Sequence, residues 1–146
     1  YAQSATEGLS GAYYPERSFG GVPVLRIDPQ VNFNWGNDAP FESDFPRDSF
    51  QVRWRGWLVP QETGWHTLST RSDDGVRLFA DGLTLVNQWR NQGPTTYYGT
   101  PIWLDAGSAI PVTLEYYESG GGALMEFNWR TPSGAEGPVP SVALRP

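Results

Sequence analysis

Two adjacent carboxylates, Asp73 and Asp74, lie in the stretch RSDDGVRLFADG (residues 71–82), directly before a glycine. Their like charges repel each other, and a hairpin turn needs only one Asp or Asn before its Gly. The pair therefore predicts either a turn that carries an extra solvated carboxylate or a site in which both side chains hold a cation. The choice depends on which other ligand groups the chain can bring to the pair.

A glycine-rich segment, ESGGGA (residues 118–123), is the first candidate partner of the pair. Glu118 offers a carboxylate, and Gly120, Gly121 and Gly122 offer backbone carbonyls. Three consecutive glycines lose much conformational entropy on folding and pack against nothing, so the segment suits a place where the backbone approaches a ligand. An ordinary hairpin loop is the other interpretation of the same residues.

The polar segment NQWRNQG (residues 87–93) supplies candidate ligand-binding side chains. Trp89 is suited equally to stacking on the C–H face of a sugar and to packing within the protein. The other candidates are polar residues that can hydrogen-bond to a ligand, three beside Trp89 and one next to Glu118: Arg90, Asn91, Gln92 and Ser119.

Groups suited to catalysis are few. His66 is the only histidine and the chain has no cysteine, so zinc ligation and imidazole base catalysis both lack partners, and we expect His66 on the surface. Glycoside hydrolysis requires an acid and a base about 5 to 9.5 Å apart across a cleft, and two adjacent Asp residues on one ion cannot take these two roles. We therefore predict that the protein is not an enzyme and has no catalytic residues.

Charge and composition argue against several classes of partner. The net charge is −6, the sequence pI is about 4.6 and the ten basic residues are scattered arginines, which argues against nucleic-acid binding. No run approaches the roughly 20 apolar residues of a membrane span, so we expect no membrane insertion. The first residues, YAQSATEG, look like a mature terminus or a piece of a longer protein. We expect a secreted protein, extracellular or at the cell surface.

Alternating hydrophobic residues indicate the elements that position these groups. Residues 50–58 place Phe50, Val52, Trp54 and Leu58 on one face, the period-two pattern of a half-buried strand. About ten such short strands, separated by turns rich in Gly and Pro, predict an all-β fold: a single antiparallel two-sheet β-sandwich, jelly-roll-like, over residues 1–146. Pro23 suggests that the strand around it lies at a sheet edge.

Residues 37–49 carry two prolines and no clear alternation, so they predict an irregular loop with one helical turn at residues 43–45. The closing segment GPVPSVALRP (residues 137–146) predicts a last strand at an edge. In a sandwich of this kind, ligands are held by loops at one end, because the framework fixes the loop bases.

The order of several motifs resembles the protective-antigen-like (PA-fourteen) lectin-like domain family over nearly the whole chain. They are GLSGAYYP, DPQVNFNWG, FQVRWRGWLVPQETGWHTLSTRSDDGVRLFADG, QGPTTYYGT and LEYYESGGGALMEFNW. The resemblance implies a β-sandwich and, in the lectin members, a calcium ion held by an Asp-Asp pair and a second loop. That pair, joined by a cis peptide bond, matches Asp73 and Asp74. The second loop matches residues 118–123, where Glu118 departs from the Asn of the fungal lectins.

The resemblance therefore implies a Ca²⁺ site made of Asp73, Asp74, Glu118, Gly120, Gly121 and Gly122. Oxygen donors of this kind suit calcium, which takes about six to eight oxygen ligands in irregular geometry. Side chains of neighbouring residues in a trans strand point to opposite faces, so we expect the Asp73–Asp74 bond to be cis. The leading hypothesis is a calcium-dependent module that binds glycans, as mono- or oligosaccharides, in adhesion or glycan recognition. The alternative is a structural or self-associating module of an extracellular fibre, adhesin or larger enzyme, in which calcium is only structural.

Overall fold

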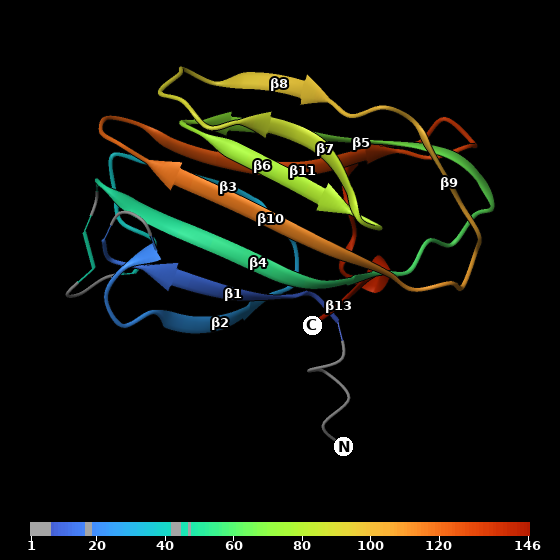
Figure 1. The fold of residues 1–146 in the computed structure, drawn as a ribbon, viewed down its shortest axis with the longest axis horizontal. Helices are drawn as coiled ribbons and strands as arrows, with labels where there is room; N and C mark the ends of the chain where they lie inside the picture. Colours follow the sequence, from blue (N-terminus) through green and yellow to red (C-terminus); the bar gives the residue numbers. More distant parts are fainter. Residues whose placement is uncertain (1–6, 17–18, 42–44, 47) are drawn as a thin grey trace.

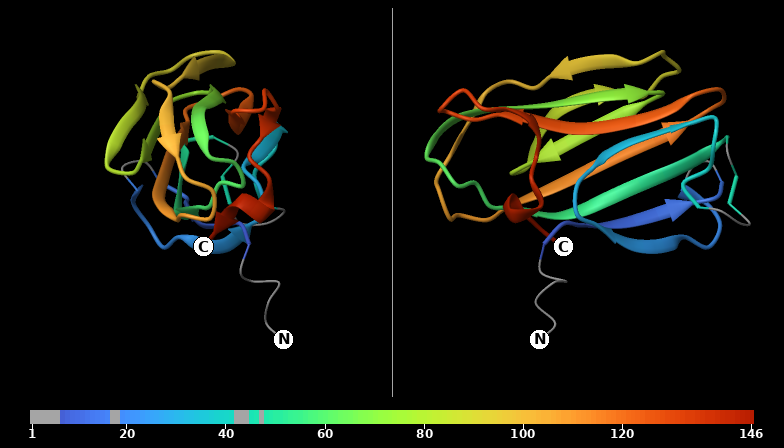
Figure 2. Two further views of the ribbon diagram at one scale, coloured as in Figure 1. Left: turned by 90° about the vertical axis from the view of Figure 1, so that its right-hand side faces the viewer. Right: turned by 180° about the vertical axis from the view of Figure 1, so that it is seen from behind.

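The computed structural model describes residues 7–16, 19–41, 45–46 and 48–146, and almost all of its regular structure is β-strand. Two antiparallel sheets pack face to face (Figures 1 and 2), which confirms the predicted all-β sandwich. The helical turn expected at residues 43–45 begins outside the described residues. Within the described ranges, no helix has the length and hydrophobicity needed to span a bilayer.

The seven-stranded sheet forms the front layer of Figure 1, in the order β2-β1-β4-β10-β6-β7, with β13 also paired to β4. Pro23 precedes β2, and β2 lies at the edge as expected. The strands of this sheet are β1 (Leu9–Tyr14), β2 (Val24–Asp28), β4 (Phe50–Leu58), β6 (Val76–Ala80), β7 (Leu83–Gln88), β10 (Ile110–Glu118) and β13 (Leu144–Arg145).

The six-stranded sheet lies behind, in the order β12-β11-β5-β8, with β3 paired to β11 and β9 paired to β5. Its strands are β3 (Asn32–Gly36), β5 (Gly64–Asp73), β8 (Thr95–Tyr98), β9 (Ile102–Leu104), β11 (Ala123–Arg130) and β12 (Glu136–Pro138). The described strands outnumber the ten or so expected because β9, β12 and β13 are two or three residues long.

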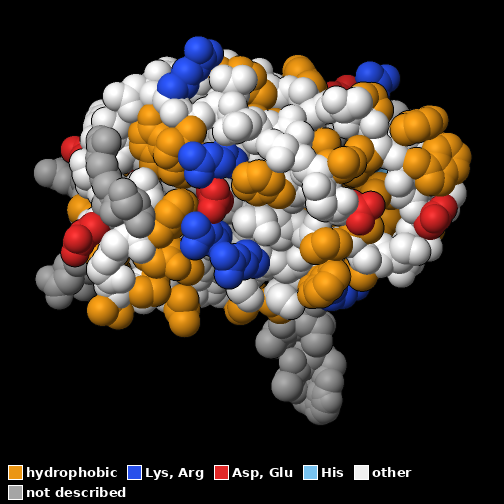
Figure 3. Space-filling view, in the orientation of Figure 1, with side chains coloured by type: hydrophobic (Ala, Val, Ile, Leu, Met, Phe, Trp, Pro, Cys, Tyr) orange, Lys and Arg blue, Asp and Glu red, His pale blue; other side chains and the backbone are white. Residues whose placement is uncertain are grey.

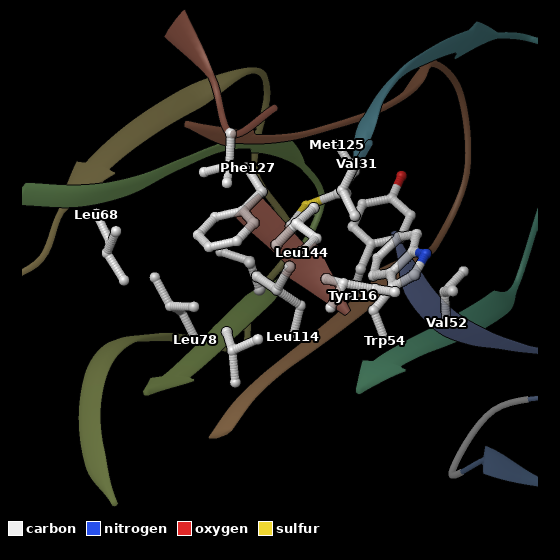
Figure 4. Packing of buried hydrophobic residues seen from close by; sticks show 14 of the residues in the cluster. Val31, Val52, Trp54, Leu68, Leu78, Leu114, Tyr116, Met125, Phe127 and Leu144 are labelled. Atoms are coloured by element: carbon white, nitrogen blue, oxygen red, sulfur yellow. The ribbon is translucent and has the colours of Figure 1, made fainter. Parts of the chain in front are cut away.

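The core fills the space between the sheets (Figure 4). On β4, the side chains of Phe50, Val52, Trp54 and Leu58 are all fully buried, as the alternation predicts. Burial of each such side chain contributes about 1.5 to 3 kcal/mol relative to its exposure to water. This packing holds β5 and β10, one from each sheet, at a fixed separation.

Two expectations were wrong. His66 is fully buried rather than on the surface, because it lies on the inward face of β5 between Gly64 and Leu68, where its ring packs 5.4 Å from that of Trp129. The closing segment is not one strand: a 3-10 helix, η3 (Ser141–Ala143), interrupts it between β12 and β13. The prolines of this segment lack the N–H that a continuous ladder needs.

The two ends of the described chain lie side by side. The backbone N–H of Gly8 donates a hydrogen bond to the carbonyl oxygen of Leu144 at 3.1 Å. Leu144 in turn begins β13, which pairs with β4. The two ends of the described chain therefore meet beside β13 and β4 in the seven-stranded sheet, near the C label of Figure 1.

Candidate metal centre

Three carboxylates from two different sheets meet at one end of the sandwich, the left end in Figure 1. Asp73 is the last residue of β5 in one sheet, and Asp74 follows it. Glu118 is the last residue of β10 in the other sheet. One carboxylate oxygen from each of the three residues lies within 4.8 Å of the others. The fold therefore brings together the carboxylates that the sequence predicted as metal ligands.

The peptide bond between Asp73 and Asp74 is cis, as expected. Asp74 is buried, whereas Asp73 is only partly so. The two neighbouring side chains thus share one site at the edge of the protein, with Asp74 on its inner side.

Asp74 connects the loops that surround the site. Its Oδ1 accepts a hydrogen bond from the backbone N–H of Gln92 at 3.0 Å, and its Oδ2 accepts one from the backbone N–H of Ser119 at 2.8 Å. Its carbonyl oxygen accepts hydrogen bonds from Ser72 Oγ at 3.0 Å and from Gln92 Nε2 at 2.9 Å. One residue therefore fixes both the β7–β8 loop and the β10–β11 loop.

Glu118 is the most constrained of the three carboxylates. It is 0% exposed, and neither of its carboxylate oxygens has a hydrogen-bond partner within the described residues. Burial is the largest cause that raises its pKa to about 9, and the close carboxyl group of Asp74 and the charges of Asp74 and Asp73 act in the same direction. A buried carboxylate without a partner is costly when ionised, so this position favours either a proton or a cation.

Asp73 responds to the same surroundings. Burial, followed by the charge of Asp74, raises its pKa to about 6. Two carboxyl groups with raised pKa values and a third beside them form a site of concentrated negative potential. Calcium carries two positive charges and prefers oxygen ligands, so the donor set fits this ion.

The glycines of residues 118–123 lie on the open side of the site. A Cβ atom at Gly122 would lie 3.8 Å from Asp73 Oδ2, so Gly122 adjoins the carboxylates. At Gly120 and Gly121 no described atom lies within 4 Å of the Cβ position, and Gly121 has a positive φ of 83°. The role of their carbonyls as calcium ligands stays a prediction.

The glycine that follows the Asp pair is required by a neighbouring ring. A Cβ atom at Gly75 would lie 2.1 Å from Cε2 of Tyr117, far closer than any side chain allows. The Gly75 carbonyl also accepts a hydrogen bond from the N–H of Tyr117 at 3.1 Å. Gly75 therefore lets β10 approach the Asp pair closely.

The predicted ligand-binding residues occupy different surroundings. Gln92 and Ser119 contact Asp74 directly, as described above. The Trp89 ring packs beside the site: the Arg77 guanidinium carbon lies 4.0 Å from its centroid, and the ring of Tyr117 meets it edge-on at 4.9 Å. The contacts of Trp89 thus favour packing on the outer face of the seven-stranded sheet over stacking on a sugar.

The side chains of Arg90 and Asn91 are held by tyrosine hydroxyls. Arg90 Nη2 donates a hydrogen bond to the hydroxyl of Tyr97 at 2.9 Å. The hydroxyl of Tyr117 donates one to Asn91 Oδ1 at 2.7 Å. Both residues belong to the loop that Asp74 fixes through Gln92, so they lie at the rim of the site.

Some residues of the site were not predicted from the sequence. The hydroxyl of Tyr116 donates a hydrogen bond to the carbonyl oxygen of Asp73. Ser49 Oγ donates one to the carbonyl oxygen of Ser119 at 3.4 Å, and the charge of Asp48 adds to the rise in the Glu118 pKa. Residues 48–49 come from the irregular loop before β4, and no local pattern connects that loop to the acidic pair.

Comparison with known proteins places this geometry in context. A family model described as the PA14 domain matches residues 5–143. The anti-sigma-I factor RsgI3 of Acetivibrio thermocellus is 35% identical over 139 residues, which cover 95% of this chain and 21% of that protein. The chain therefore spans about a fifth of the length of this curated relative.

Two solved structures show the same fold. An anti-sigma factor domain-containing protein superposes with a TM-score of 0.93 at 34% identity, over 97% of this chain and 48% of that one. A PA14 sugar-binding domain from an RTX adhesin superposes with a TM-score of 0.75 at 23% identity, over 97% of this chain and 99% of that one.

Proposed function

The chain belongs to the PA14 domain family, and from this premise we propose that it is a non-enzymatic module that binds glycans through a calcium ion. Asp73, Asp74 and Glu118 would hold the ion, and backbone carbonyls of residues 120–122 would complete its ligands. A bound calcium ion would supply coordination positions for two neighbouring sugar hydroxyls, whose oxygens resemble the water molecules that they replace.

The observation that carries the proposal is the buried, unpartnered carboxylate of Glu118. Within the described residues it has no hydrogen-bond donor, and the nearest charged groups, Asp73 and Asp74, have the same sign. A divalent cation would satisfy all three carboxylates together. The raised pKa of Glu118 means that the side chain gives up a proton when it takes a cation as its partner.

The other residues would shape the sugar site rather than hold the ion. Asp74 keeps the β7–β8 and β10–β11 loops in place through the backbone of Gln92 and Ser119. Arg90 and Asn91 lie in the first of these loops and would select among sugars by hydrogen bonding. The open space beside Gly120 and Gly121 leaves room for a ligand to reach the ion.

The comparisons support the coarser part of this proposal. The RTX adhesin domain is described as sugar-binding, and it has the same fold as this chain. The relatives with higher identity are anti-sigma factor proteins of which this chain covers half or less. We propose that the chain is an extracellular or cell-surface part of a larger protein, in which glycan binding serves adhesion or sensing.

A structural role for calcium is the second candidate, because Asp74 already ties two loops together. Calcium titration by calorimetry, followed by a glycan array in calcium and in chelator, separates the two. Glycan binding that disappears in chelator and in Asp74→Asn, but persists in the control Asp81→Asn at an exposed turn, supports the lectin function. Calcium binding without any glycan binding supports the structural role, and the absence of calcium binding overturns both.

A further inference from the structure

The outer face of the six-stranded sheet carries a long groove. One part, of about 680 Å³, lies over β5, β8, β11 and β12, and a second part, of about 460 Å³, continues it toward β9. The two parts share Thr67 and Arg130. Thr67 and Ser69, on β5, have short side chains and form the floor, so the groove follows the strand direction.

Aromatic side chains lie along the groove on the side of β8 and β9 and at the β9 end of its floor. Tyr98 on β8 is 68% exposed, Trp65 on β5 is 60% exposed and Trp103 on β9 is 54% exposed. Trp65 and Trp103 are cross-strand partners whose rings meet edge to face at 5.5 Å. Figure 3 shows hydrophobic side chains at the right end of the molecule, where Figure 1 places β9, and the groove itself lies on the face turned away from the viewer. Three exposed rings on one face form an apolar patch of the kind that marks an interaction site.

The opposite side is polar. Asn128 and Arg130 on β11 face the floor residues, because they pair with Ser69 and Thr67. Within the described chain, Arg130 makes no hydrogen bond or ion pair, so its donors are available to a ligand. Hydrogen-bonding groups on one side and rings on the other suit a ligand with a hydroxyl rim and apolar C–H faces.

The charges in the groove and directly beside it balance, because Arg71 and Arg130 offset Glu126 and Glu136. Arg71 forms an ion pair with Glu126 at 3.3 Å. Arg130 stands opposite Glu136 in the pairing of β11 with β12. A groove with no excess charge complements an uncharged ligand better than a polyanion or a polycation.

The side chains along the groove also argue against a protein partner. Among the described residues that line it, the only aliphatic side chains are the rings of Pro101, Pro132 and Pro138, and no Ala, Val, Leu, Ile or Met is present. The cores of protein interfaces, by contrast, are rich in apolar contacts. The exposed aliphatic residues gather elsewhere, on and before β2, and include Val22, Leu25 and Ile27. A hydroxyl-rich chain is the occupant that matches the groove.

We propose that this groove is a second, metal-independent site that binds an extended, uncharged polysaccharide. Tyr98, Trp65 and Trp103 stack on its sugar rings, and Asn128 and Arg130 hydrogen-bond to its hydroxyls. Tyr98 pairs with Ser69, four residues along β5 from Trp65, so the aromatic side chains span about 13 Å at the strand rise of about 3.3 Å per residue. More than one sugar ring fits along that length.

The groove is separate from the acidic site. Trp65 and Asp73 are eight residues apart on the same strand, a separation of about 26 Å at the same rise. Calcium removal therefore leaves the groove intact, and the two sites can be tested separately.

Affinity electrophoresis in excess chelator tests the proposal. The probes are four uncharged soluble polysaccharides, namely hydroxyethyl cellulose, xyloglucan, mixed-linkage β-glucan and galactomannan, with polygalacturonate as a charged comparison. We expect retardation by at least one uncharged probe and a loss of affinity of about tenfold in Trp103→Ala or Trp65→Ala. Trp57→Ala, which removes a 47% exposed Trp from the other sheet, and Asp74→Asn should both bind as the unmodified protein does.

Folding and the rival occupant are checked in parallel. If Trp103→Ala fails to fold, Trp103→Tyr takes its place in the test. The Tyr ring keeps an aromatic plane, so this variant should retain most of the binding. The proposal is overturned if none of the uncharged probes retards the protein in chelator, or if binding persists in the folded Trp65 and Trp103 variants. It is also overturned if sedimentation shows self-association that Trp103→Ala abolishes, because the face is then a protein interface. Loss of calcium-dependent binding in Asp74→Asn, with groove binding intact, would affect only the function proposed for the acidic site.

Discussion

Asp74 Oδ2 accepts a hydrogen bond from the backbone N–H of Ser119 at 2.8 Å, and this contact joins the end of one sheet to the loop that leaves the other. The same carboxylate holds Gln92 through its second oxygen. The residue that we propose as a calcium ligand is thus also the residue that positions the surrounding loops.

Replacement of Asp74 by Ala should abolish calcium binding and leave the sandwich folded. The loss of two backbone partners should lower the free energy of unfolding by about 1 to 3 kcal/mol, because the N–H groups of Gln92 and Ser119 lose their acceptor. Calorimetry and urea unfolding measure the two effects. Retained calcium affinity in a folded Asp74→Ala protein would show that the ion, if it binds, binds elsewhere.

The stability of the calcium-free protein should fall as pH rises from about 5 to about 9. Glu118 has a folded pKa of about 9 against an ordinary value of 4.5, so between these values the folded state binds more protons than the unfolded chain. The free energy of unfolding then decreases with pH across that window and levels off above it. Urea unfolding in chelator at several pH values measures the slope.

Glu118→Gln provides the control for this effect, because its amide does not titrate. The slope should be smaller in this variant, and calcium affinity should fall with the loss of a carboxylate. An equal slope in the two proteins would assign the pH dependence to another group.

Calcium should raise the melting temperature of the protein. The three carboxylates converge only in the folded state, so binding stabilises that state by linkage, by about 2.7 kcal/mol when free calcium is about 100 times Kd. Calorimetric melting in excess calcium and in excess chelator gives the comparison. Identical transitions under the two conditions would exclude a specific site of useful affinity.

Gly75→Ala should destabilise the protein by about 1 to 3 kcal/mol or more, because the new methyl group overlaps the ring of Tyr117. The matched control is Gly120→Ala, where no described atom lies within 4 Å of the added Cβ. Chemical unfolding of both variants measures the difference. Equal stabilities would show that β10 can move away from the Asp pair without cost.

Local alternation predicted the framework well. The inward face of β4 follows from alternation, since alternate side chains of a strand face opposite sides, and the edge position of β2 follows from Pro23, which cannot donate to a ladder. The cis bond between Asp73 and Asp74 was also predicted, from the family resemblance and from the need of two adjacent side chains to reach one ion.

The remaining features depend on contacts that are distant in the sequence. Alternation fails in the second half of β10, where Leu114 to Glu118 are all buried, because Arg53 covers Glu115 and Trp89 covers Tyr117 on the outer face. His66 is buried for the same kind of reason, since the pattern places it on a face without showing what covers that face. The packing of Trp89 against Arg77 is equally invisible in the sequence of its own loop.

The contact between Gly8 and Leu144 has a mechanical consequence. Tension on the two ends of the described chain would act across a single point, where these residues hydrogen-bond beside β1, β4 and β13. Asp73, Asp74 and Glu118 lie at one end of the sandwich, off that line of force. A pull through a longer polypeptide would therefore load the strands at the chain ends first, and the acidic site would keep its geometry while the flanking chain bears tension.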